Sequence, residues 1–228
     1  MSMILYDLSG ADPDLRFSPF CWRTRFALAH KGLPVETVPW RFTDTEAIAF
    51  SGQRLVPVLR DDDRVVSDSW SIAEHLERVH PNPTIFGGPI GLSYARFVNS
   101  WADSVLIMGI ARLIVRDIFD VIDAKDQDYF RSSRETWFGM TLEQFQAGRE
   151  DRLAAFRETL TPVRLVLGRQ AWLGGSTPNY ADHIVAGTLM WPRCSSRFPL
   201  LVDDDPVAQW FGRMLDQYGG LGRTAKIP

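Results

Sequence analysis

The chain divides at residues 80–89, where three prolines and two glycines fall within ten positions. Proline lacks a backbone N–H and clashes with the preceding helical turn, so no helix can run through this segment. Strand-like and helix-like segments alternate before it, whereas the segments after it have helical spacing. This pattern predicts an α/β domain at 1–82 and an all-α domain, a helical bundle, at 90–228.

The first eighty residues predict the element order βαβ followed by ββα, which is the thioredoxin-like order. The expected segments are a strand at 3–8, a helix at 18–31, a strand at 35–38, paired strands at 56–60 and 64–67, and a helix from 69 to 80. Residues 43–50 fit either a short helix or an irregular loop. Beyond the break, helices are expected at 94–123, 126–137, 142–168 and 182–190, with a further helix start at Pro206 after a solvated acidic turn.

Composition excludes several classes of protein. A net charge of −3 gives no basic surface for nucleic acid. No segment approaches the roughly 20 apolar residues of a membrane helix, and the N-terminus lacks a secretory signal, so we expect a cytoplasmic protein without membrane contacts. The two cysteines, Cys21 and Cys194, suit a reducing compartment, and no metal site is predicted. Eight tryptophans and 14 phenylalanines are enough to line an apolar ligand cavity as well as a core.

Ser18 stands at the start of the first expected helix, directly before Pro19. This pair is an ordinary N-cap with proline at the first helical position. The same position carries the reactive group in a thioredoxin-like domain, because the positive helix end and a hydroxyl together stabilise a thiolate. Cys21, three residues further on, has no cysteine partner in the motif, so a dithiol cycle is excluded and Cys21 is interpreted as a small apolar helix residue.

Two further segments complete a possible small-thiol site. Arg54 precedes Val56-Pro57, and a proline here in thioredoxin-like folds is cis, which turns the backbone of the preceding Val56 outward to pair with a peptide ligand. A trans proline at a strand end is the alternative. Asp68-Ser69 begins the next helix, either as a simple cap or as a site for a ligand that carries both a carboxylate and an ammonium.

In their order and spacing these segments resemble the glutathione transferase superfamily, and Asn179-Tyr180-Ala181-Asp182 resembles its buried capping motif. The resemblance implies the glutathione transferase fold, with glutathione as cosubstrate and a homodimeric assembly. Ser18 is then the catalytic thiolate stabiliser. The resemblance implies that glutathione is bound by Arg54, Val56, Pro57, Asp68 and Ser69. An apolar aromatic substrate is expected beside Trp101, Met108 and Arg112.

Residues 133–138, 141–143, 146–153 and 172–175 resemble bacterial β-etherases, which cleave lignin-derived aryl ethers. This implies thiolate attack on a carbon bearing an aryloxy group, with loss of a phenol. Two alternatives stay open. One is a general detoxifying transferase for electrophilic aromatics, and the other is a non-catalytic ligand-binding protein with the same fold.

Overall fold

The computed structural model describes residues 3–228 and contains one small mixed sheet. Its strands are β1 (Met3–Leu8), β2 (Glu36–Trp40), β3 (Val58–Asp61) and β4 (Arg64–Ser67), in the spatial order β2-β1-β3-β4. β1 runs parallel to β2 and antiparallel to β3, and β3 and β4 form an antiparallel pair. β2 contains Pro39, which the sheet tolerates because β2 is an edge strand.

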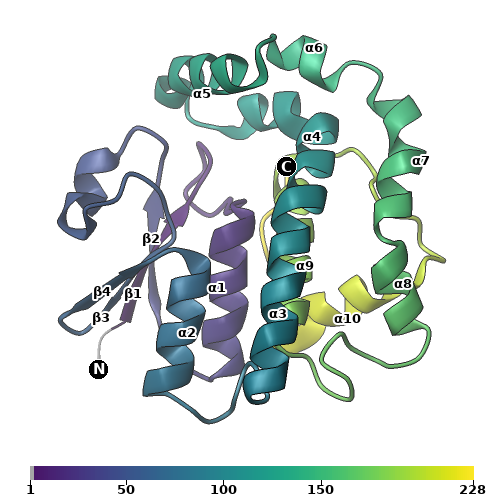
Figure 1. Ribbon diagram of the computed structural model, residues 1–228. Helices are drawn as coiled ribbons and strands as arrows, with labels where there is room; N and C mark the ends of the chain where they lie inside the picture. Colours follow the sequence, from purple (N-terminus) through teal and green to yellow (C-terminus); the bar gives the residue numbers. More distant parts are fainter. Residues whose placement is uncertain (1–2) are drawn as a thin grey trace.

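Three helical segments accompany the sheet: α1 (Pro19–His30), the 3-10 helix η1 (Thr45–Ser51) and α2 (Ser69–Val79). The predicted thioredoxin-like order is confirmed. Residues 43–50, which fit either a short helix or a loop, contain most of the 3-10 helix η1. β3 begins at Val58 and not at Val56, because Pro57 cannot donate to the sheet. α1 and α2 lie on the side of the sheet that faces the rest of the molecule (Figure 1).

The remainder is helical, as expected, and Figure 1 shows it beside α1 and α2. Its elements are α3 (Pro89–Trp101), a π-helical turn η2 (Ala102–Leu106), α4 (Ile107–Val121), α5 (Ala124–Phe138), α6 (Leu142–Gln146), α7 (Arg149–Thr159), α8 (Thr161–Leu167), α9 (Tyr180–Ser195) and α10 (Pro206–Gly220). The predicted helix at 142–168 is three helices, broken at Gly148, whose φ is +68°, and again before Pro162. The domain limits at 82 and 90 stay a prediction. No helix within residues 3–228 is long and apolar enough to cross a membrane.

α9 is buried along almost its whole length and packs against α1. At Gly187 a Cβ atom would stand 2.8 Å from the backbone nitrogen of Arg23 and 2.9 Å from the carbonyl oxygen of Pro19. Only glycine permits this approach. The first turn of α1 is therefore held directly against the central helix.

The start of α9 is fixed by the capping motif. Asn179 Oδ1 accepts from the Ala181 amide at 2.9 Å, and Asp182 Oδ2 accepts from the Asn179 amide at 3.0 Å, so the predicted reciprocal cap is confirmed. The fully buried Asp182 also accepts from the Leu173 and Gly174 amides and from Trp210 Nε1, each at 2.8 Å. It joins α9, α10 and the loop before α9.

We expect Asp182→Ala to destabilise the protein more than Asn179→Ala. The Asn179 change removes one cap bond, which costs about 0.5–2 kcal/mol. The Asp182 change leaves four donors without their acceptor, at about 1–3 kcal/mol for each one that stays buried. Denaturant unfolding followed by tryptophan fluorescence measures both, with activity per folded molecule as the control. Equal losses in the two variants would contradict the role assigned to Asp182.

Candidate active site

Ser18 is the N-cap of α1, and its side chain is buried. Its Oγ accepts a hydrogen bond from the Cys21 amide at 3.2 Å, which leaves the hydroxyl proton available to a ligand or to the neighbouring Cys21 sulfur. Pro19 occupies the first turn, where a missing N–H leaves no helical bond unmade. The position thus combines a hydroxyl donor with the positive end of a helix.

Cys21 lies behind Ser18 with no solvent exposure. Burial and the nearby Asp7 carboxylate raise the pKa of the Cys21 thiol well above its ordinary value, against an opposing hydrogen bond from Ser18. A thiol in this state is a poor nucleophile. Its place in the apolar core agrees with the interpretation as a small helix residue.

The Val56-Pro57 peptide bond is cis, as the sequence predicted. Within residues 3–228 the Val56 backbone makes no hydrogen bond, whereas the Pro57 carbonyl accepts from the Asp68 amide at 3.1 Å. Val56 and Ser18 line the same cavity. Arg54, two residues earlier, is exposed and forms no ion pair within the described chain.

Asp68 and Ser69 begin α2 in a strained geometry. Asp68 has φ +76° and ψ 135°, a backbone conformation that non-glycine residues rarely adopt and that clusters at ligand sites. Its Oδ2 accepts from the Ser71 amide at 3.0 Å, so it is a true N-cap. The carbonyl of the buried Ser69 accepts from Tyr180 Oη of α9 at 2.8 Å.

A cavity of about 320 Å³ opens beside Ser18, between the sheet-containing half and the helical half. One wall is Leu8, Phe17, Ser18, Pro19, Phe20, Trp40, Phe42, Leu55 and Val56, and the other is Ile107, Ala111, Val115 and Ile118 of α4, Phe130, Arg134, Trp137 and Phe138 of α5, and Trp191 of α9. The lining is almost entirely apolar and rich in aromatic rings, which suits an aromatic ligand.

Trp101, Met108 and Arg112 do not line this cavity, so their predicted place in it is corrected. The α4 residues that line the cavity are those at 107, 111, 115 and 118. Met108 and Arg112 each come one position after a lining residue, so they lie on a different face of the helix. Arg112 is exposed and stacks on the Phe145 ring, with 5.0 Å from its guanidinium carbon to the ring centroid. Trp101 ends α3, half-buried against the core.

The α5 residues of the cavity were missed at the sequence level. Their positions, 130, 134, 137 and 138, recur at helical spacing, and this signal was available. It is weak because α5 is polar around most of its circumference, with only Asp126 and Phe130 buried.

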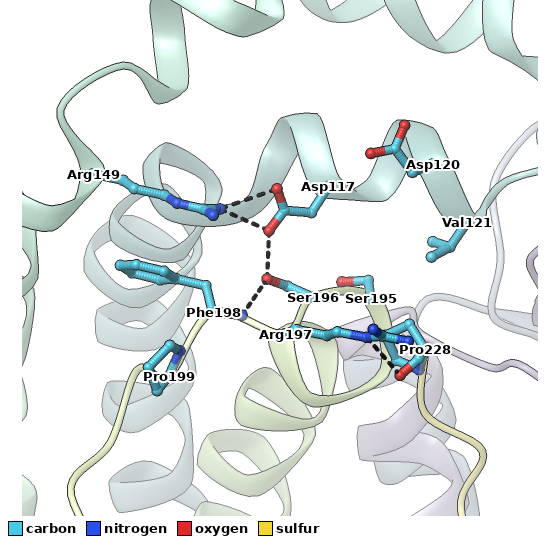
Figure 2. A pocket seen from close by; sticks show the side chains of 10 residues that line it. All are labelled: Asp117, Asp120, Val121, Arg149, Ser195, Ser196, Arg197, Phe198, Pro199 and Pro228. Carbon is cyan, nitrogen blue, oxygen red and sulfur yellow. Dashed lines mark hydrogen bonds and ion pairs between the residues drawn. The ribbon is translucent and has the colours of Figure 1, made fainter.

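A second hollow, of about 480 Å³, lies between α4, α7 and the segment that follows α9 (Figure 2). Most of its charged groups have partners, and Asp120 pairs with Arg116 at 2.7 Å. Asp117 accepts from Arg149 at 2.8 and 3.0 Å and from Ser196 Oγ at 2.5 Å, and Arg197 Nε donates to the Pro228 carbonyl. This hollow is larger than the cavity beside Ser18 but lacks that cavity's aromatic, apolar lining.

The chain matches two models of one family: the glutathione S-transferase N-terminal domain over residues 17–79 and the glutathione S-transferase C-terminal domain over residues 94–198. It is 32% identical over 93 residues to glutathione S-transferase Z1 of Arabidopsis thaliana, and the match covers 39% of this chain and 41% of the plant protein.

Among solved structures, glutathione transferase GSTFuA3 of Phanerochaete chrysosporium has a TM-score of 0.84 at 24% identity over 96% of this chain and 97% of its own. The glutathione S-transferase CsGST63524 of Ceriporiopsis subvermispora, solved in complex with glutathione, has a TM-score of 0.84 at 20% identity over 100% and 99%. These likenesses show the shared fold. Because both domain models of one family match in order along most of its length, the chain belongs to the glutathione S-transferase superfamily.

Proposed function

We propose that this protein is a glutathione transferase that joins the glutathione thiolate to an electrophilic aromatic substrate. The observation that carries this proposal is the position of Ser18, a buried hydroxyl at the N-terminus of α1 that borders an apolar, aromatic-lined cavity. The family membership and the solved relative in complex with glutathione support the choice of thiol.

Each end of glutathione has a matching group in the proposed site. Ser69 and the first amides of α2 suit the γ-glutamyl carboxylate, and Asp68 suits its ammonium. The unpaired Val56 backbone suits the cysteinyl peptide group, which would add to the sheet as a short strand, beside Pro57. The exposed Arg54 supplies a cation for a remaining carboxylate.

The chemistry of the proposed reaction follows from thiol ionisation. A free thiol has a pKa of about 8.5, and lowering it by about two units needs about 2.7 kcal/mol. A helix N-terminus contributes roughly 0.3–1 kcal/mol. A hydrogen bond from the Ser18 hydroxyl to a charged sulfur contributes about 1.5–3 kcal/mol, so the two contributions together span the required amount. Ser18 therefore acts as a thiolate stabiliser.

Ser18→Ala is expected to lower turnover at neutral pH by roughly ten- to hundredfold while glutathione still binds, because the hydroxyl acts on the sulfur and most binding contacts lie elsewhere. The ultraviolet absorbance of the bound thiolate against pH measures the cause directly. Ser18→Thr, which keeps a hydroxyl, should retain most activity. An unchanged pKa of the bound thiol in Ser18→Ala would exclude Ser18 from this role.

Asp68→Asn and Ser69→Ala should weaken glutathione affinity with little effect on the bound thiol. Asparagine caps helices about as well as aspartate, so Asp68→Asn removes the charge and keeps the cap. We expect an increase in Kd of about tenfold, equivalent to ~1.4 kcal/mol, in calorimetric titrations. Asp63→Asn, on the exposed hairpin turn, is the control. Unchanged glutathione affinity in both site variants would mean that Asp68 and Ser69 only cap α2.

We further propose a β-etherase-like reaction as the specific form. Three residues of the β-etherase-like segment at 133–138 border the cavity, namely Arg134, Trp137 and Phe138. The thiolate attacks the carbon that bears the aryloxy group, a C–S bond forms, and the C–O bond breaks. The bonding electrons leave with the aryloxide, which takes a proton from water to give a phenol.

With glutathione, the protein is expected to release a phenol from a β-aryl ether whose neighbouring carbon is a ketone, because the carbonyl activates the adjacent bond to displacement. A cavity that holds the rings in line with the sulfur adds a proximity effect. A fluorogenic aryl ether reports release in one assay. Release from neither enantiomer, alongside conjugation of a chlorinated nitrobenzene, would favour a general detoxifying transferase. Glutathione binding without any turnover would favour a non-catalytic ligand-binding protein.

A homodimer and a cytoplasmic location are proposed with this function. α3 leaves Ile90 88% and Phe97 70% exposed, and β4 leaves Val65 41% exposed, so these elements offer apolar surface for a second copy of the chain.

A further inference from the structure

Arg134 is the one charged side chain that lines the cavity within residues 3–228. It projects from α5 on the same face as Phe130, Trp137 and Phe138. Its guanidinium carbon lies 5.2 Å from the centroid of the Phe130 ring and 5.7 Å from that of Phe42. Phe42 belongs to the sheet-containing half, so the charge stands where the two halves meet over the cavity.

The Arg134 guanidinium has no carboxylate partner in the described chain. Its one hydrogen bond runs from Nη1 to Ser133 Oγ at 3.3 Å. Arg131 on the same helix contrasts with it, because that guanidinium pairs with both Glu135 and Glu143. Of the five N–H donors of Arg134, four are therefore free for a ligand.

Arg134 is half-buried beside the apolar lining, and a carboxylate bound in the cavity would pair with its guanidinium. Burial lowers the pKa of Arg134, with an opposing effect from Tyr129. The guanidinium nevertheless stays charged, because its ordinary value lies far above physiological pH. The planar edge of a guanidinium matches the two oxygens of a carboxylate.

Resting on the proposed transferase function, we propose that Arg134 is a specificity-determining residue that selects aromatic acceptors bearing a carboxylate on the ring. The aromatic walls hold the ring, and the Arg134 edge binds the carboxylate. The acceptor is thereby oriented with its electrophilic carbon toward Ser18. The proposal narrows the substrate class from aromatic electrophiles in general to aromatic acids.

The test compares an acid with its neutral ester, 4-chloro-3-nitrobenzoate and methyl 4-chloro-3-nitrobenzoate, as acceptors for glutathione. Arg134→Met should lower kcat/KM for the acid at least tenfold, mainly through KM, and change that for the ester less than twofold. Arg134→Lys should fall between. Arg112→Met is the matched control, since Arg112 also stacks on a ring but lies outside the cavity. Equal effects of Arg134→Met on acid and ester would overturn the proposal.

A binding experiment without thiol separates this inference from the proposed function. Calorimetric titration with 1-naphthoate and with methyl 1-naphthoate should show at least tenfold weaker binding of the naphthoate alone in Arg134→Met. Unchanged naphthoate binding in that variant would overturn the role of Arg134. The absence of conjugation with every acceptor would instead refute the transferase proposal, and a naphthoate preference that depends on Arg134 would survive it.

Discussion

The close contact between α1 and α9 at Gly187 is the constraint on which the rest of the structure depends. Any larger residue there would meet the Arg23 backbone and also the Pro19 carbonyl, which belongs to the first turn of α1. Around this contact the fully buried Arg23 donates to Thr188 Oγ1 and to Asn99 Oδ1, both at 3.0 Å, and pairs with Asp103 at 2.8 Å. Because that turn carries Ser18, the packing of the two halves positions the candidate thiolate stabiliser.

α9 holds the second part of the site as well. Tyr180, in its first turn, donates to the Ser69 carbonyl at the start of α2, and the Asp68 amide in turn binds the Pro57 carbonyl. The three segments around Ser18, Val56 and Asp68 are remote in sequence but are linked to one buried helix. The strained backbone of Asp68 persists because these bonds over-determine it.

The two halves contribute different chemistry to the cavity. The sheet-containing half presents a helix N-terminus and a hydroxyl, which favour negative charge at the sulfur. The helical half presents rings from α4 and α5 and one guanidinium, which lie where the acceptor would bind. The cavity lining contains few polar groups, so the local dielectric constant is low. The electrostatic interaction between each of these groups and a bound ligand is therefore stronger than in water.

Local chemistry determined much of this protein. The caps at Ser18, Asp68 and Asn179 follow from short-range rules, because a side chain that satisfies free amides at a helix start lies within three residues of them. The order of strands and helices was also predictable from short-range patterns. These are the periodicity of apolar side chains and the prolines and glycines that separate the segments. Glutathione contacts at these positions remain predictions.

The tertiary structure decided which residues of α4 line the cavity. Met108 and Arg112 differ from the cavity-lining Ile107 and Ala111 by one position, which is about 100° around a helix, and no local signal fixes that angle. Arg134 stands among several charged residues of α5, and its place in the cavity lining beside Phe42 follows from how the two halves pack. Sequence thus determined the order of the elements in the first eighty residues and the caps at Ser18, Asp68 and Asn179. Packing between the halves decided which faces line the cavity, because that choice depends on contacts remote in the chain.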